Sequence, residues 1–282
     1  MTLRIAVPNK GSLSESATLM LKEAGYRQRN DLRDLVFIDP DNEIEFYYLR
    51  PRDIAIYVGN GELEAGITGR DLLIDSAAPA SEILALDFGK STFRFAAPNG
   101  SNITEKNLAG KRIATAYPGL LARFLEENKF KAEIVKLDGA VESAVRLGVA
   151  DVIADVVSTG GTLRQAGLGI FGEVILQSEA VLIERSGVSR NPALDTLVRR
   201  LNGVVIARQY VLVDYDVQNS DLQKACDLTP GIESPTISPL QKRDWNAVRA
   251  MVPKKDVNRI MDELWAIGAR GILVTEIHAC RL

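Results

Sequence analysis

One short loop of this chain has the residue types that bind a phosphate group. It consists of two glycines between hydroxyl side chains, namely Ser158, Thr159, Gly160, Gly161 and Thr162. The glycines permit positive φ and leave backbone N–H groups open to a ligand oxygen, and the hydroxyl groups can donate further hydrogen bonds. Asp155 lies just before the loop, where its carboxylate would repel a phosphate. A sugar with vicinal hydroxyls would give that carboxylate a donor, so the pattern predicts a ribose 5-phosphate group.

The segments around this loop are those of an open α/β sheet. Residues 149–157 are apolar except for Asp151 and Asp155 and are rich in β-branched side chains, which predicts a buried strand of a parallel sheet. Residues 163–165 can begin a helix. Ligands bind such sheets beyond the carboxyl ends of the strands, which is where Asp155 and the loop are expected. An ordinary strand-to-helix turn, with serine and threonine as caps, explains the same residues without a ligand.

Lys10 is expected at a similar position, after the first predicted strand. That strand covers residues 3–7, and Ser12 with Glu15 forms a capping-box pattern that predicts a helix just after Lys10. The lysine would then lie at the carboxyl end of a strand and beside a helix N-terminus, which favours binding of an anion. A solvated loop lysine is the alternative.

Two arginines follow another predicted strand, at residues 44–49. Arg50 and Arg52 flank Pro51, and in this proline-fixed loop they could hold a pyrophosphate or triphosphate through charge-assisted hydrogen bonds. Surface arginine without a ligand is the alternative, and it is the stronger one for Arg52. The next segment, residues 54–58, fits either a strand or a short helix.

The order of predicted strands and helices indicates two α/β lobes. The chain crosses from the first lobe to the second around residues 87–94 and later returns. Two lobes joined by two crossings place a cleft between them, as in periplasmic binding proteins. We therefore expect lobe I at residues 1–90 and 181–209, and lobe II, with the phosphate loop, at residues 91–180.

The pattern changes at Tyr210, after which a βαββαβ order predicts a ferredoxin-like domain over residues 210–282. The strands are expected at residues 211–216, 236–240, 245–252 and 271–278, with helices after Ser220 and over residues 256–267. Nothing in this order carries catalytic chemistry. A small appended sheet of this kind more often binds an effector or builds an oligomer.

The composition excludes several classes of protein. With 282 residues, 46% hydrophobic and 25% charged, the chain is typical of a globular protein of two or three domains. A net charge of −3 and a pI near 5.5 argue against a nucleic-acid polymer as partner. No apolar run approaches the ~20 residues of a membrane span, and the N-terminus lacks a signal-peptide layout, so we expect no membrane partner.

Few cysteines and histidines limit the possible metal and acid–base chemistry. Cys226 and Cys280 are too few for a disulfide scaffold or a metal cluster, and they suit a reducing cytoplasm. His278 is the only histidine, which almost removes histidine relays and histidine metal sites. Any metal would be a hard cation held mainly by ligand phosphates, and Mg²⁺ fits. We therefore assign no protein ligand of a metal from the sequence.

Residues 142–163 resemble the signature of the ATP phosphoribosyltransferase family, whose members catalyse the first step of histidine biosynthesis. The matching positions are Glu142, Gly148, Ala150, Ile153, Asp155, Val156, Thr159, Gly160, Thr162 and Leu163. Two further stretches, residues 8–11 and 66–71, also resemble that family, and the similarity covers essentially the whole chain.

The resemblance implies transfer of a phosphoribosyl group from phosphoribosyl pyrophosphate to N1 of the ATP adenine, with Mg²⁺ as cofactor. Residues 158–162 would bind the 5-phosphate, and Asp155 and Glu142 the ribose hydroxyls, although Glu142 also fits a solvated helix position. Lys10 and Arg50 would act in catalysis with Asp155 by neutralising the polyphosphates. The ATP side of the cleft would contain Gly69, Arg70 and Asp71. Many phosphoribosyltransferases carry two adjacent acids before the loop, but Ala154 replaces the first one here.

The resemblance is to the long form of the family, whose C-terminal domain binds histidine and mediates hexamer assembly from dimers. Its histidine site matches Asp216, Ile232, Ser234, Thr236 and Gly271. Without the resemblance, the segment at residues 229–235 is equally well explained as a proline-rich turn.

Two other functions fit part of the sequence. A phosphoribosyltransferase for another base would share the phosphate loop, but the ferredoxin-like domain and residues 66–71 argue against it. A two-lobed small-molecule receptor would need no phosphate loop, and a secreted receptor would need an export signal.

Overall fold

The computed structural model describes residues 2–187 and 191–281 of the chain. It forms two compact units, of which the first contains Met1–Lys22 and Tyr26–Val198, and the second Glu23–Gly25 and Arg199–Leu282. The first unit holds two sheets and the second unit one sheet, so each sheet is described in turn.

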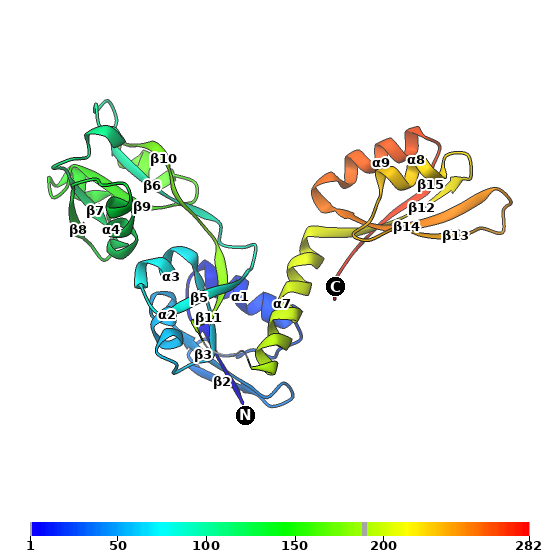
Figure 1. The fold of residues 1–282 in the computed structure, drawn as a ribbon, viewed down its shortest axis with the longest axis horizontal. Helices are drawn as coiled ribbons and strands as arrows, with labels where there is room; N and C mark the ends of the chain where they lie inside the picture. The colour runs from blue at the N-terminus through cyan, green and yellow to red at the C-terminus, as the bar shows by residue number, and fades with distance from the viewer. Residues whose placement is uncertain (1, 188–190, 282) are drawn as a thin grey trace. The chain divides into compact units, whose positions relative to one another are not determined.

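The first sheet of the first unit has six strands in the order β2-β3-β1-β4-β11-β5. Its first five strands and their helices are β1 (Leu3–Pro8), α1 (Ser12–Glu23), β2 (Val36–Asp39), β3 (Ile44–Leu49), α2 (Pro51–Gly59), β4 (Ala65–Gly69), α3 (Arg70–Ser76) and β5 (Ala80–Ala85). The sixth strand, β11 (Ala180–Arg185), comes much later in the chain and pairs antiparallel with both β4 and β5. Figure 1 shows this late strand in yellow-green among the blue and cyan elements.

The second sheet of the first unit has the order β10-β6-β9-β7-β8. Its elements are β6 (Ser91–Pro98), η1 (Glu105–Asn107), β7 (Arg112–Thr115), α4 (Pro118–Glu127), β8 (Glu133–Lys136), α5 (Ser143–Arg146), β9 (Val152–Val157), α6 (Gly161–Gln165) and β10 (Leu168–Ser178). Fully buried aromatic and aliphatic residues such as Phe93, Phe95 and Val152 pack against α4 on one face of this sheet. The strand before the phosphate loop, β9, is largely buried, as predicted. It pairs parallel with β7 but antiparallel with β6, so the sheet is mixed rather than parallel, which the sequence did not indicate.

Two chain segments cross between these lobes, one after β5 and one after β10. The architecture therefore matches the prediction of an α/β fold with two lobes like those of periplasmic binding proteins. At the crossings, Arg70 pairs with Glu82 at 2.8 Å and with Glu179 at 3.4 Å. Glu179 also accepts a hydrogen bond from the Asp87 N–H at 3.0 Å.

Some local predictions were wrong. Residues 54–58 lie in the helix α2, with Pro51 in its first turn, so the strand alternative is excluded. The strand before the phosphate loop begins at Val152 rather than at Val149, because Val149 N–H closes a turn onto the Ala144 carbonyl after α5. The short strands β2 and β5 had no clear pattern in the sequence and were not predicted.

The second unit contains the last domain, which α7 (Pro192–Gln209) leads into. Its order is β12 (Tyr210–Gln218), α8 (Leu222–Leu228), β13 (Thr236–Pro239), β14 (Trp245–Pro253), η2 (Lys254–Asp256), α9 (Val257–Ala266) and β15 (Arg270–Glu276). The antiparallel sheet has the order β13-β14-β12-β15, which confirms the predicted ferredoxin-like βαββαβ fold. The residue before α8 is Asp221 rather than Ser220, one position later than predicted.

Alternate residues of β12 face the helices and form the core of this domain. Val211, Val213, Tyr215 and Val217 are almost fully buried and pack with residues of α8 and α9, while the residues between them are partly exposed. The Tyr215 hydroxyl lies 2.7 Å from Thr229 Oγ1, and the Thr229 hydroxyl lies 3.0 Å from the Ala225 carbonyl. A buried chain of hydrogen bonds thus joins β12 to the end of α8.

This chain of hydrogen bonds gives a stability prediction. Because Thr229 donates to a carbonyl, Tyr215 is the donor to Thr229, and Thr229→Val leaves a buried hydroxyl without an acceptor. We expect Thr229→Val to cost about 1–3 kcal/mol and Tyr215→Phe about 1 kcal/mol of unfolding free energy. Hydrogen exchange of the amides in β12 and α8 measures both. A larger loss for Tyr215→Phe than for Thr229→Val would contradict this assignment.

Candidate functional site

Asp155 is a partly buried carboxylate near the carboxyl end of β9. Its Oδ1 accepts a hydrogen bond of 2.8 Å from the Val156 N–H. Burial raises the pKa of the Asp155 carboxyl to about 6, and the negative charges of Glu142 and Asp71 add to the increase. The Arg52 guanidinium acts in the opposite direction and lowers this pKa. Charged groups from both lobes therefore lie close enough to Asp155 to affect its ionisation.

The predicted phosphate loop follows β9 directly. Gly160 is buried and has φ 68°, in the left-handed region, and α6 begins at Gly161. The side chains of Ser158, Thr159 and Thr162 are on exposed residues, so they are open to a ligand. Helical hydrogen bonding starts with the Arg164 N–H, which donates to the Gly160 carbonyl at 3.1 Å. The N–H groups before Arg164 have no partner within the helix and can face an anion.

A cavity of about 460 Å³ lies next to this loop. It is lined by residues of the loop and strand end and of both crossing segments, namely Val157, Ser158, Lys90, Ser91, Thr92, Gln177, Ser178, Glu179 and Arg70. The cavity therefore connects the phosphate loop with the crossings between the lobes, which is where a ligand held by both lobes would lie.

Lys10 and Arg50 lie beyond the carboxyl ends of two neighbouring strands of the first sheet. β1 and β3 are parallel neighbours with Pro8 opposite Leu49, and the Asn9 N–H donates to the Leu49 carbonyl at 2.8 Å. Lys10 and Arg50 come directly after these strand ends. Within residues 2–187 and 191–281, neither side chain has a hydrogen bond or an ion pair, so both cations are available to a polyphosphate.

The predicted ATP-side residues follow β4, the other neighbour of β1. Gly69 is buried and precedes α3. Asp71 is also buried, and its Oδ1 accepts a hydrogen bond of 2.7 Å from the Ser178 hydroxyl of the crossing segment. The Arg70 guanidinium is engaged with Glu82, Glu179 and the Gln177 carbonyl. In this conformation Arg70 therefore stabilises the crossing.

Tyr117 is a site residue that the sequence analysis missed. It follows β7 at the start of α4, and its ring lies under the Arg52 guanidinium, 4.9 Å from the ring centroid. Burial and the nearby Asp71 and Asp155 carboxylates raise the pKa of the Tyr117 phenol. A tyrosine at a helix start belongs to no motif. Its only sequence signal is its place after a predicted strand, in front of Pro118 and Gly119.

The residues expected to bind histidine are only partly brought together. A Cβ at Gly271 would lie 3.5 Å from Asp216 Oδ2, so these two residues are neighbours. Ile232, Ser234 and Thr236 are exposed, and β13, which starts at Thr236, pairs with β14 rather than with β12. One strand thus separates Thr236 from β12, a distance of about 10 Å. The sequence predicted one pocket containing all five residues. Within one chain the structure instead has two separate groups of them.

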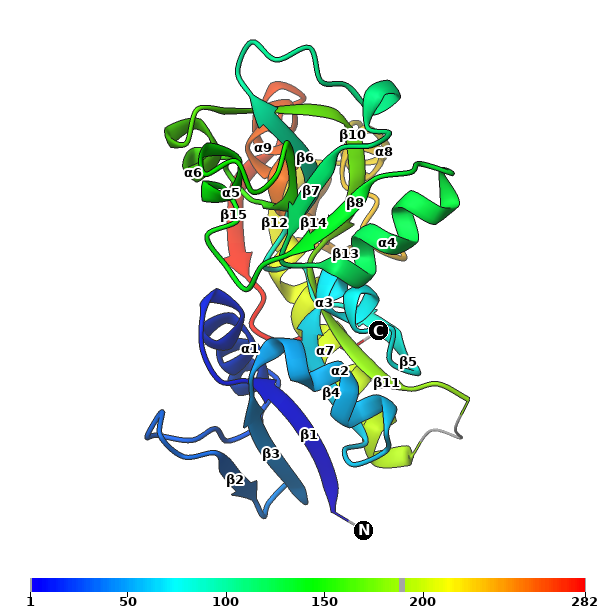
Figure 2. The ribbon, with the colours of Figure 1, turned by 90° about the vertical axis from the view of Figure 1, so that its left-hand side faces the viewer.

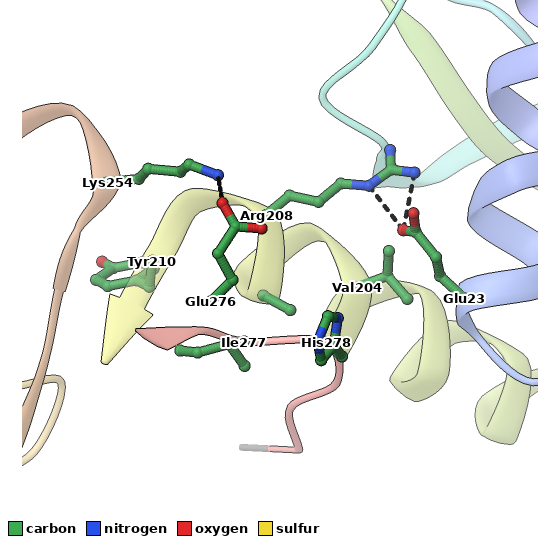
Figure 3. Close-up of a pocket in the computed structure, with 9 residues that line it drawn as sticks. Glu23, Val204, Arg208, Tyr210, Lys254, Glu276, Ile277 and His278 are labelled. Carbon is green, nitrogen blue, oxygen red and sulfur yellow. Dashed lines mark hydrogen bonds and ion pairs between the residues drawn. The ribbon is translucent and has the colours of Figure 1, made fainter. Parts of the chain in front are cut away.

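A second cavity, of about 160 Å³, lies in the second unit where α7 meets β12. Figure 3 shows that its charged residues form pairs: Arg208 with Glu23 at 2.9 Å, and Lys254 with Glu276 at 2.6 Å. His278 also lines it. Because these opposite charges neutralise one another, this cavity is a poorer candidate for a charged ligand than the cavity beside the phosphate loop.

The structure also bears on metal and membrane binding. In the part of the chain that the structure describes, no three histidine, cysteine, aspartate or glutamate residues form a cluster that could hold a metal ion. No helix there is both long enough and apolar enough to cross a membrane.

Comparison with known proteins gives consistent matches along the chain. Residues 50–203 match the family HisG, described as ATP phosphoribosyltransferase. Residues 207–279 match the family described as the C-terminal domain of HisG. An ATP phosphoribosyltransferase of Pseudarthrobacter chlorophenolicus is 62% identical over 99% of this chain and 100% of its own length. One of Salinispora tropica is 60% identical, also over 99% and 100%. A solved structure of the ATP phosphoribosyl transferase (HisG:HisZ) complex from Thermotoga maritima is similar with a TM-score of 0.63 and 26% identity, covering 72% of this chain and 98% of that one.

The raised pKa of Asp155 predicts how stability depends on pH. The folded chain binds this proton more tightly than the unfolded chain, so stability falls as pH rises from about 4 through about 6. Asp155→Asn removes this loss, and we expect it to add about 1–2 kcal/mol of unfolding free energy at pH 8 and nothing near pH 3.5. Denaturant titrations at both pH values measure the difference. A destabilised Asp155→Asn variant at pH 8 would contradict the electrostatic environment described for this carboxylate.

Proposed function

This chain belongs to the ATP phosphoribosyltransferase family, and on that premise we propose that its reaction centre lies between the phosphate loop after β9 and the strand ends of the first sheet. The enzyme transfers the phosphoribosyl group of phosphoribosyl pyrophosphate to N1 of the ATP adenine and releases pyrophosphate, the first step of histidine biosynthesis. The observation that supports the location most strongly is the convergence of charges on Asp155 from α2, α3 and Glu142.

We assign the phosphoribosyl group to the second lobe. The hydroxyls and N–H groups of residues 158–162 bind the 5-phosphate, and the Asp155 carboxylate accepts hydrogen bonds from the ribose diol. Glu142, half-buried and close enough to act on the pKa of Asp155, is the second acceptor. The two hydroxyl groups of the ribose would donate hydrogen bonds to the Asp155 carboxylate. These bonds would stabilise its ionised form, which burial makes unfavourable.

Departure of pyrophosphate leaves positive charge on the ribose ring and negative charge on the leaving group. Lys10 and Arg50, two cations without a protein partner in the described part of the chain, neutralise the leaving group. Because they lie on neighbouring strand ends, they can hold one polyphosphate together. Asp155 stays ionised and stabilises the developing charge on the ribose, so the protein acts by positioning and by fixed charges.

The carboxylates at the cleft suit Mg²⁺ carried in by the substrate phosphates. Asp155, Glu142 and Asp71 are hard oxygen donors whose mutual repulsion a divalent cation would relieve. Asp155 and Asp71 would face the ion, which supplies charge neutralisation of the pyrophosphate when it is bound.

ATP is assigned to the first lobe. Gly69 lets the Asp71 carboxylate lie against the backbone after β4, because a Cβ there would be 2.3 Å from Asp71 Oδ1, and Asp71 in turn lies close to Tyr117. Arg70 contributes by holding the crossing segments beside the cavity, and it can reach a phosphate only if it leaves Glu82.

We propose that the domain limits are residues 1–90 and 181–209 for lobe I, 91–180 for lobe II and 210–282 for a regulatory domain that binds histidine. Asp216 and Gly271 form one part of the histidine site, and Ile232, Ser234 and Thr236 form another. Since β14 separates the two parts within one chain, a second copy that brings its own β13 side to the first part would complete the pocket. Exposed Leu273 on the edge strand β15 supports assembly into dimers and hexamers. The enzyme would act in the cytoplasm.

The reaction centre can be tested by kinetics. With ATP, phosphoribosyl pyrophosphate and Mg²⁺, the absorbance of an N1-substituted adenine should rise, and chelation of Mg²⁺ should stop it. We expect Asp155→Asn and Thr162→Val each to lower kcat/KM by about 10- to 100-fold, because a hydrogen bond to a charged group is worth about 1.5–3 kcal/mol. Ser101→Ala, on a loop of the same lobe, is the control. Wild-type kinetics of folded Asp155→Asn would rule out the proposed site.

The regulatory site can be tested by inhibition. Histidine should inhibit the full chain without competing with ATP. Asp216→Ala should weaken this inhibition by about 10- to 100-fold, because a hydrogen bond to a charged group is worth about 1.5–3 kcal/mol. Asp227→Ala, an aspartate of the same domain on α8, is the control. Equal inhibition of wild type and Asp216→Ala, or strict competition with ATP, would show that the effector site lies elsewhere.

A further inference from the structure

Asp75 connects the two lobes at a place outside the substrate groups already described. It lies near the end of α3 in the first lobe, and its carboxylate is 8% exposed. Its Oδ1 accepts hydrogen bonds from the N–H groups of Gly119 at 2.8 Å and Leu120 at 3.2 Å, which are in the first turn of α4. A carboxylate of one lobe therefore caps a helix of the other lobe.

This cap completes the hydrogen bonding at the start of α4. Tyr117, the residue before the helix, makes no capping hydrogen bond with its side chain, and Pro118 has no N–H. The Leu121 N–H donates to the Tyr117 carbonyl at 3.0 Å, which is the first bond within the helix. The remaining two donors of this turn are those bound by Asp75, so the turn depends on a residue from the other lobe.

Two further contacts fix the position of Asp75. Its Oδ2 accepts a hydrogen bond of 2.6 Å from Arg52 of α2, and the same guanidinium covers the Tyr117 ring. A Cβ at Gly119 would lie 2.2 Å from the Asp75 carbonyl oxygen, so only glycine lets α4 approach α3 this closely. Figure 2 shows α3 and α4 next to each other.

We propose that Asp75 is a positioning residue that sets the geometry of the cleft by capping α4 across the lobes. Through the first turn of α4 it holds Tyr117 beside Asp71 and Asp155, and through Arg52 it places a positive charge near the same carboxylates. Asp75 acts through these groups and touches no reacting atom. The inference rests on the proposed location of the reaction centre, which Asp155→Asn tests separately.

Three variants and one matched control test the proposal in the full-length protein. Asp75→Ala removes the cap, and Asp75→Asn keeps an oxygen that can accept both N–H bonds. Gly119→Ala pushes α4 away from α3 and so stretches the cap while the Asp75 carboxylate stays in place. Asp151→Ala is the control. Like Asp75, Asp151 accepts a hydrogen bond from a backbone N–H and forms an ion pair with an arginine, but both contacts are to Arg112 of the same lobe.

We expect Asp75→Ala and Gly119→Ala to lower kcat for ATP and phosphoribosyl pyrophosphate by about 10- to 100-fold, the effect of misplacing reacting groups by about 1 Å. Asp75→Asn should recover most of that loss. Binding of ribose 5-phosphate, which needs only the loop of the second lobe, should stay unchanged in all of them. Hydrogen exchange should speed up at the amides of positions 119 and 120 in Asp75→Ala and Gly119→Ala, and much less in Asp75→Asn. Asp151→Ala should lose thermal stability but keep its kcat.

Three results would overturn the proposal: wild-type kcat in Asp75→Ala, a loss of kcat in Asp75→Ala no larger than in Asp151→Ala, or a large loss of ribose 5-phosphate binding in Asp75→Ala. If Asp75→Ala does not fold, wild-type kcat in Gly119→Ala is decisive against it. If Asp155→Asn is fully active while Asp75→Ala is impaired, the proposed reaction centre is wrong and the interlobe cap remains.

Discussion

Repulsion among carboxylates near the end of β9 is the interaction on which the arrangement of the first unit most depends. Asp155, Glu142 and Asp71 come from both lobes. Burial raises the pKa of Asp155, and the negative charges of Glu142 and Asp71 raise it further. A protein selected only for stability would separate such groups or replace one of them. Here the three carboxylates are kept together. In our proposal, the ribose hydroxyls of the substrate and the Mg²⁺ bound to its phosphates stabilise their negative charges. The stability given up at this position is a common feature of reaction centres.

Several polar contacts hold the two lobes together. Arg70 with Glu82 and Glu179 stabilises the crossing segments, and the Ser178 hydroxyl fixes Asp71. Asp75 adds a contact on the side of α3 and α4. Arg70, Glu82 and Glu179 are charged and partly exposed, so their ion pairs can be rearranged at modest cost, whereas the Asp71 and Asp75 carboxylates are held in buried positions. The fully buried residues of the two lobes form separate apolar clusters, and Ile74 of α3 packs against the cluster of the second lobe.

The sequence predicted what depends on local patterns, and it missed what depends on partners far along the chain. The alternation of Val211, Val213 and Tyr215 identified β12, and the Gly160-Gly161 pair identified the loop, because these signals lie within a few residues. Tyr117 and Asp75 carry no motif, and the groups around them come from distant parts of the chain in both lobes. The separation of Thr236 from Asp216 depends on strand order in the sheet, which the order along the chain does not give.

The place of β11 in the first sheet has a consequence for how the chain folds. This strand fills the gap between β4 and β5, although the whole second lobe comes before it in the chain. On the ribosome, β4 and β5 therefore wait with unpaired edges while residues 91–178 are made, which takes on the order of 5–20 s at the usual speed of translation. The second lobe is continuous and can fold during that wait, so the lobe made first is completed last. Open strand edges in the waiting lobe are where a newly made chain would be most exposed to aggregation.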